Sequence, residues 1–442
     1  MTCDDALRLA TRRELFARIR EERDAVRAYL LDTFPAEAEY FESASERART
    51  VSILLGSPRG GTSVIKQVLA AADNALALPG EHRLFFTLLG LNFPDSGGDA
   101  EAAERGPLAA ADRKFLLDSL LLECHGEPIP EPDKGERERF AWEWALRLRL
   151  QWPELDLDLE QIVGWLVDAF ARHDWRTEST LTVMRTLLDH GVAVNPYYYD
   201  LDPALVRSAF PDIAVPTGPP ASTIIEISPF LALSPTRRPV PGARPVLMIK
   251  ASSDAYRIPL LHELFDGWRI NELHLVRNPL AAVNGLIDGW EHTCFWQHDL
   301  SATGHFGQSD VDRRHWNFDL FDGWQKQLDA PLAELCAWQW ADPHQRILAN
   351  AAPARRILFE DFQRGGLDRR AMFEQAAGAA GLDFGAAMAR AAAAPKPVNQ
   401  TVTGRRARWR DRAGLDQILA IPAVEGMARR LGYDPAAVDT WL

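Results

Sequence analysis

A glycine-rich segment at residues 56–63 carries the residue types that bind phosphate. It reads Gly-Ser-Pro-Arg-Gly-Gly-Thr-Ser and directly follows an apolar run at 51–55. Apolar residues then recur at helical spacing over 64–72. A buried strand, a glycine loop and a helix in this order can point backbone N–H groups and the helix N-terminus at an anion. The segment therefore favours a phosphate cradle over the alternative, a tight strand-to-helix turn without a ligand.

The position of the cation indicates which phosphate this loop would bind. In a nucleotide triphosphatase, a lysine precedes the final Ser/Thr, whose hydroxyl binds Mg²⁺. Here Thr62 and Ser63 end the loop without that lysine, and Arg59 lies inside it. A second apolar run, 273–276, ends in Arg277 rather than in a magnesium-binding aspartate. We therefore expect a metal-free site for a monophosphate rather than an ATP site.

The elements that position these residues alternate between strands and helices. Apolar runs at 246–249 and 273–276 precede helical segments at 258–265 and 281–287. Such alternation is typical of a parallel sheet covered by helices, so we predict a three-layer α/β fold with a P-loop-like sheet. A charged helix is predicted over residues 4–32.

The stretch 95–240 differs in texture from the rest of the chain. It combines Trp- and Leu-rich helical patterns with proline-rich turns. We interpret it as an inserted helical subdomain. The chain then divides into an N-terminal helical segment (1–50), an α/β core (51–94 and 241–442) and this insertion.

Composition narrows the function classes. Lys and Arg number 49 and Asp and Glu 62, a net charge of -13, which argues against a nucleic-acid binder. The four cysteines are scattered and predict neither a disulfide framework nor a metal site. No run approaches the roughly 18 apolar residues of a membrane span, and the first thirty residues are too charged for a signal peptide. We expect a cytoplasmic protein.

Residues 57–63 resemble the 5′-phosphosulfate loop of the PAPS-dependent sulfotransferases of bacterial type, where PAPS is 3′-phosphoadenosine 5′-phosphosulfate. Four further stretches follow in that family's order, at 249–265, 275–279, 357–362 and 404–433. The resemblance implies transfer of the sulfuryl group of PAPS to a hydroxyl, less often an amine, of a small-molecule or carbohydrate acceptor. It implies no metal, and it does not extend to the insertion, which we expect to build the acceptor side.

The resemblance also implies the donor-binding residues. The 5′-phosphosulfate would contact the loop, through Arg59, Gly60, Gly61, Thr62 and Ser63. The 3′-phosphate would contact the end of the second strand and a basic C-terminal loop, through Arg277, Arg405, Arg406 and Arg408. Family members usually add a serine at the position of Gly285, so Asn284 is expected to substitute for it.

The catalytic residues implied are Arg59, Lys250, Glu81 and His82. Lys250 would lie beside the transferring sulfuryl group. Where cytosolic members carry a histidine two residues after this lysine, the chain has Ser252, so we assign the general base to Glu81, with His82 second. A glutamate in partly apolar surroundings would have a raised pKa, which suits proton abstraction near neutral pH. The alternative is that Glu81 and His82 form a surface pair in a turn without a catalytic role.

Two other functions stay open. A P-loop kinase would need the absent lysine and aspartate, and a non-catalytic relative would bind PAPS or its product without turnover. Gly285 and Ser252 are the departures that favour the second. The aromatic segment 290–324 either lines the acceptor pocket, covers it as a lid, or packs against the insertion.

Overall fold

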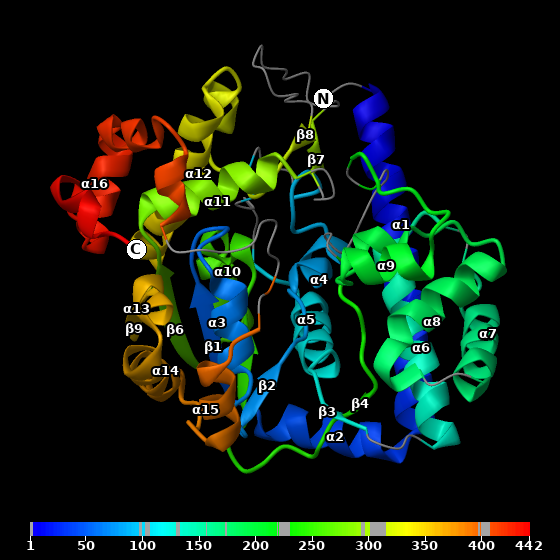
Figure 1. Cartoon of the computed structure of the whole chain (residues 1–442). Coiled ribbons are helices and arrows are strands. Elements are labelled where there is room, and N and C mark those ends of the chain that lie inside the picture. The colour runs from blue at the N-terminus through cyan, green and yellow to red at the C-terminus, as the bar shows by residue number, and fades with distance from the viewer. Residues whose placement is uncertain are drawn as a thin grey trace.

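The computed structural model describes residues 3–96, 100–101, 107–129, 133–155, 157–172, 175–218, 220, 230–292, 297–300, 315–396, 398 and 407–442. Within these residues a five-stranded sheet lies at the centre, in the order β2-β5-β1-β6-β9 (Figure 1). Its strands are β1 (Thr50–Leu55), β2 (Ala75–Ala77), β5 (Val246–Ile249), β6 (Arg269–Val276) and β9 (Arg355–Leu358). All neighbouring strands are parallel. The predicted fold class is therefore confirmed, with β1 in the middle.

One face of the sheet is covered by the helix that follows the glycine loop and by two C-terminal helices. These are α3 (Thr62–Leu69), α14 (Gly366–Ala380) and α15 (Ala386–Ala393). Side chains alternate between the two faces of a strand, so Leu54 of β1 and Leu275 of β6 pack here against Ile65 of α3. This packing fixes the N-terminus of α3 at the carboxyl edge of the sheet.

A larger group of helices covers the other face, where Val51, Ile53 and Leu55 of β1 are buried. It includes the predicted charged N-terminal helix, confirmed here as α1. The helices that contribute to this core are α1 (Cys3–Thr33), α2 (Pro35–Arg47), α4 (Arg83–Leu88), α5 (Ala110–Leu122), α10 (Ile258–Leu264), α11 (Pro279–Trp290), α12 (Leu332–Asn350) and α16 (Pro422–Leu431). Short α13 (Phe359–Arg364) follows β9 directly.

The insertion has a hydrophobic core of its own, built around Phe140, Trp144 and Leu166. Its helices are α6 (Lys134–Gln151), α7 (Leu159–Arg172), α8 (Trp175–Asp189) and α9 (Pro203–Ala209). Figure 1 shows them to one side of the sheet, next to α1. Although α5 falls within residues 95–240, it packs in the sheet core, and the predicted division of the chain stays a prediction.

The described residues also form short two-stranded pairs outside the central sheet. β3 (Glu127–Pro128) pairs with β4 (Thr236–Arg237), and β7 (His298–Asp299) pairs with β8 (His315–Trp316). A search of the described helices finds none with the length and apolar character of a membrane span.

Replacing Gly61 by alanine tests the packing that holds the loop. Gly61 has φ +95°, and a Cβ there would come within 2.2 Å of the Phe359 ring. Gly267 has a similar φ of +81° with no neighbour within 4 Å of a Cβ. We expect Gly61→Ala to lower the free energy of unfolding in urea by about 2–4 kcal/mol, and the control Gly267→Ala by only about 1–2 kcal/mol. Equal losses would contradict the contact with Phe359.

Candidate functional site

The glycine loop curls at the carboxyl end of β1 and leads into α3. The Gly60 N–H donates to the Ser57 carbonyl (3.1 Å), and Arg59 and Gly61 both have positive φ, 59° and 95°. The Ser57 Oγ is buried and has no hydrogen-bond partner in the described structure. At this loop the positive end of the α3 dipole therefore faces the carboxyl edge of the sheet.

Arg277 lies beside the loop at the end of β6. Its Nη1 donates to the Arg59 carbonyl (3.1 Å), and its guanidinium lies 4.8 Å from the centroid of the Phe359 ring. The Arg277 Nε is buried without a hydrogen-bond partner among the described residues. Burial lowers the pKa of Arg277, while Glu360 opposes that shift. A buried guanidinium with a spare N–H matches the anion site that the sequence predicts here.

Arg59 brings a second guanidinium to the same place. Burial lowers its pKa to about 10, and the neighbouring charges of Arg277 and Arg408 lower it as well. Its Nε donates to the Gly285 carbonyl on α11 (3.2 Å), and a Cβ at residue 285 would lie 3.4 Å from the Arg59 Cβ. The departure from serine at this position has no steric cause, because a Cβ there would make only ordinary van der Waals contact with Arg59.

The C-terminal basic segment reaches α11 through two arginines. Arg408 and Arg412 both form ion pairs with the buried Asp288. Asn284 is buried, and its Oδ1 accepts from the Arg412 Nε (2.9 Å). Arg408 thus lies with Arg59 and Arg277, whereas the Asn284 carbonyl oxygen is bonded to Arg412. The predicted contacts of Arg405 and Arg406 fall outside the described residues.

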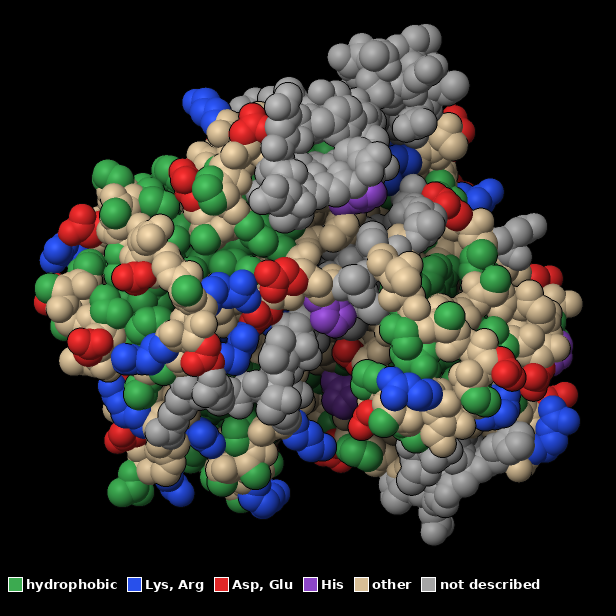
Figure 2. Space-filling view, turned by 45° about the horizontal axis from the view of Figure 1, so that its top comes forward, with side chains coloured by type: hydrophobic (Ala, Val, Ile, Leu, Met, Phe, Trp, Pro, Cys, Tyr) green, Lys and Arg blue, Asp and Glu red, His purple; other side chains and the backbone are tan. Residues whose placement is uncertain are grey.

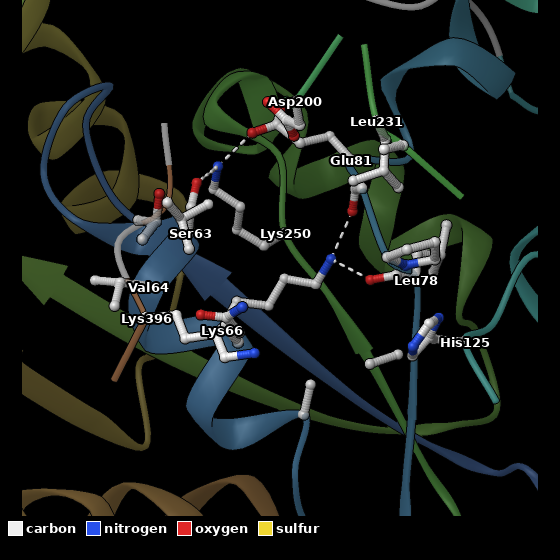
Figure 3. Close-up of a pocket in the computed structure, with 18 of the residues that line it drawn as sticks. Ser63, Val64, Lys66, Leu78, Glu81, His125, Asp200, Leu231, Lys250 and Lys396 are labelled. Atoms are coloured by element: carbon white, nitrogen blue, oxygen red, sulfur yellow. Dashed lines mark hydrogen bonds and ion pairs between the residues drawn. The ribbon is translucent and has the colours of Figure 1, made fainter. Parts of the chain in front are cut away.

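Lys250 is brought to the loop by β5, which ends one residue earlier. It is buried, and its Nζ donates to the Ser63 Oγ (3.1 Å) and to the Glu81 carboxylate (Figure 3). The structure therefore joins three predicted site residues from β5, α3 and the loop before α4. The same loop contains the predicted residues Gly60 and Gly61, and α3 begins directly after it at Thr62.

The pKa of Glu81 differs from the prediction. Burial raises it, as expected, but the charge and hydrogen bond of Lys250 more than compensate and leave the pKa below its usual value. The expected raised pKa of Glu81 is therefore wrong. Lys250 lies 169 residues away along the chain, so a local reading of the segment around Glu81 could not include it.

His82 has a different position from the one expected of a base. It is buried, does not line the cavity described below, and its Nε2 is 2.9 Å from the Asp254 Oδ1. The other Asp254 oxygen accepts from the Ala251 N–H (2.7 Å). His82 therefore supports the turn that carries Lys250 and Ser252 instead of facing the acceptor side.

Lys66 of α3 is a site residue that sequence reasoning missed. Its Nζ donates to the carbonyls of Leu78 (2.6 Å) and Gly80 (2.5 Å), and so it holds the segment that presents Glu81 (Figure 3). Burial lowers its pKa to about 8, and the charge of Lys250 contributes. The only sequence signal was a lysine on the apolar face of a short helix, which is equally typical of a solvated side chain.

A cavity of about 1900 Å³ connects the loop with the insertion. One end is lined by Arg59, Arg277 and Arg408, the middle by Glu81 and Lys250, and the far end by residues of the insertion such as Arg147, Tyr197 and Tyr199. Figure 2 shows the surface hollowed between the sheet core and the insertion, with basic side chains along the rim on the core side. The volume exceeds what one nucleotide needs, so a second ligand fits beside it.

The aromatic segment 290–324 is divided between the core and the cavity. Trp290, Trp316 and Trp324 are buried and pack against one another, with ring centroids 5.4–5.5 Å apart for the two pairs that include Trp316. His292 and Asp319 line the cavity. Residues 293–296 and 301–314 lie outside the described part of the chain, so the predicted lid stays a prediction.

Comparisons with known proteins find no matching family model and no matching curated protein. Among solved structures, the sulfotransferase domain from the Synechococcus PCC 7002 olefin synthase is 15% identical, with a TM-score of 0.32, over 88% of this chain and 96% of that one. The sulfotransferase domain from the curacin biosynthetic pathway is 11% identical, with a TM-score of 0.34, over 88% and 99%. The sulfotransferase STF9 from Mycobacterium avium is 14% identical, with a TM-score of 0.35, over 94% and 83%. Likenesses this low leave the function to be argued from the site itself.

Replacing Lys66 by methionine tests its role in holding the segment before Glu81. The change leaves the buried Leu78 carbonyl without this donor, at a cost of about 1–3 kcal/mol, and the half-buried Gly80 carbonyl at a smaller cost. We expect Lys66→Met to lower the free energy of unfolding in urea by about 2–4 kcal/mol. The control Lys114→Met removes an exposed lysine of α5 and should change it by less than about 0.5 kcal/mol. Similar values for the two variants would contradict the positioning role.

Proposed function

We propose that this protein is a PAPS-dependent sulfotransferase that transfers the sulfuryl group to a hydroxyl of a small-molecule or carbohydrate acceptor. The observation that carries the proposal is the junction of Arg277 with the loop, where its Nη1 donates to the Arg59 carbonyl. This junction places two guanidinium groups and the N-terminus of α3 around one edge of the sheet. A nucleotide with a 5′-phosphosulfate and a 3′-phosphate supplies anions for both.

The chain's own residues divide the binding work. The loop and Ser63 would bind the 5′-phosphosulfate. Arg277 and Arg408 would bind the 3′-phosphate, with Arg405 and Arg406 as predicted partners outside the described residues. The charges of Arg277 and Arg408 lower the pKa of Arg59, and a bound dianion would relieve that repulsion.

Lys250 would act on the transferring group. Its ammonium is within hydrogen-bond distance of Ser63, so a sulfate oxygen or the bridging oxygen held by the loop would lie within its reach. Charge builds on the bridging oxygen as the S–O bond breaks, and a fixed ammonium stabilises it. Glu81 accepts from Lys250 and keeps its ammonium group oriented.

A P-loop kinase is the less favoured function. The lysine nearest the loop on α3 is Lys66, which donates to two backbone carbonyls and does not take the Walker position. Arg277 stands where a magnesium-binding aspartate would be needed. A non-catalytic binder of the same nucleotide differs from the enzyme only in turnover, so experiment must separate the two.

Thermal unfolding with three nucleotides tests the donor assignment. We expect 3′-phosphoadenosine 5′-phosphate to raise the melting temperature more than 5′-AMP does, because only the bisphosphate engages Arg277. A ligand at 100 times its dissociation constant adds ~2.7 kcal/mol of stability, which such a measurement resolves. A larger rise in melting temperature with ATP and Mg²⁺, or no rise with any of the three nucleotides, would contradict the proposal.

A further inference from the structure

The proposed function needs a group that takes the proton of the acceptor hydroxyl, and the structure offers one that sequence reasoning did not identify. Asp319 lines the same cavity as Lys250 and Glu81, close to the turn that follows β5. The Ser252 hydroxyl, itself half-buried on the cavity wall, donates to the Asp319 Oδ1 (3.3 Å). Ser252 thus links the cavity to a buried carboxylate.

The two oxygens of Asp319 are bonded unequally. The Oδ1 accepts from Ser252 and lies 3.5 Å from the Arg83 Nη1. The Oδ2 is buried and has no hydrogen-bond partner among the described residues. A buried carboxylate oxygen without a donor favours the protonated form, since nothing stabilises the negative charge on it.

A second carboxylate, Glu101, binds most of the neighbouring cationic groups. Glu101 is fully buried and accepts from Arg83 (2.8 Å) and Arg257 (3.0 Å), and its Oε1 lies 3.1 Å from the His298 Nε2. These groups hold the pKa of Glu101 well below its usual value, even though burial raises it. Arg83 lies farther from Asp319 than from Glu101. Burial first, and then the charge of Glu101, therefore raises the pKa of Asp319 to about 7.

We propose that Ser252 and Asp319 form a proton relay that deprotonates the acceptor hydroxyl. The inference rests on the proposed function and assigns its general base. The acceptor proton passes to the Ser252 Oγ while the serine proton passes to the Asp319 Oδ1. The acceptor oxygen then forms its bond to sulfur, and the bond between sulfur and the 5′-phosphate oxygen breaks with its electron pair on that oxygen. Asp319 later returns its proton to solvent.

Ser252 is the catalytic residue of this relay, because it alone contacts the acceptor, and Asp319 acts through it. The relay works only when Asp319 is ionised, so the rate should rise with pH through about 7 and then level off. The charged and titratable groups that face Asp319 from the surrounding elements are Glu81, Arg83, Glu101, Tyr256 and Arg257. Of these, Glu81 and Arg83 also line the cavity, and Glu81 is the one that accepts from Lys250.

Single-turnover conversion of PAPS to 3′-phosphoadenosine 5′-phosphate tests the relay, with glycerol and 4-nitrophenol as probe acceptors. With glycerol we expect Ser252→Ala and Asp319→Asn to slow conversion by about 10²–10³-fold and to remove the rise near pH 7. Ser252→Thr keeps the hydroxyl and should retain most of the rate. With 4-nitrophenol, which ionises readily, the losses should be smaller. Glu81→Gln is the comparison, and it should keep a rise with pH, displaced to lower pH because the Glu81 charge no longer raises the pKa of Asp319.

Binding measurements separate this inference from the proposed function. All four variants should keep the thermal shift with 3′-phosphoadenosine 5′-phosphate, which also shows that they fold. If Ser252→Ala and Asp319→Asn keep the wild-type rate and pH profile, or if Glu81→Gln alone removes the rise, the relay is wrong while the donor assignment stands. The same holds if the wild-type protein binds the bisphosphate but converts PAPS with neither probe. Failure of the bisphosphate to bind the wild-type protein overturns both.

Discussion

Arginine guanidinium groups lie close together at the carboxyl edge of the sheet. The electrostatic repulsion between them is the constraint on which the rest of the site depends. Arg59 and Arg277 are held there by backbone contacts, since each donates to a carbonyl of the loop or of α11. Burial and their mutual repulsion lower the pKa of Arg59 to about 10. A net charge of -13 on the whole chain does not relieve this local excess, because distant surface charges are screened. A ligand with two anionic groups is the natural counter-charge.

Acidic groups in the cavity are separated by their surroundings into two kinds. Glu81 is paired with Lys250 and Glu101 with two arginines, and in both cases the cations keep the carboxylate ionised despite burial. Asp319 lies beside them with one oxygen unbonded, and its pKa rises to about 7. Carboxylates whose surroundings move their pKa values apart are suited to different tasks, here orientation of a lysine and acceptance of a proton.

The sequence carried enough local signal for the loop, its flanking strand and helix, and the strand that ends at Arg277. Features that depend on contacts between distant segments could not be predicted. The Gly285 carbonyl accepts from Arg59, which is 226 residues away along the chain, and no local pattern shows this contact. The pKa of Glu81 depends on Lys250, and Lys66 is recognisable only once its two carbonyl partners are known. Asp319 belongs to an aromatic segment without a motif, so its place beside Ser252 appears only in the folded chain.

The central claim is that Arg277 recognises the 3′-phosphate of a nucleotide whose 5′ end lies on the loop. The most direct test is calorimetric titration of the wild-type protein and of Arg277→Met with 3′-phosphoadenosine 5′-phosphate and with 5′-AMP. The control is Arg429→Met, which changes an exposed side chain on α16. The account predicts that Arg277→Met weakens the bisphosphate about ten- to a hundredfold and leaves 5′-AMP nearly unchanged. Equal weakening of both nucleotides, or no effect on either, would contradict it.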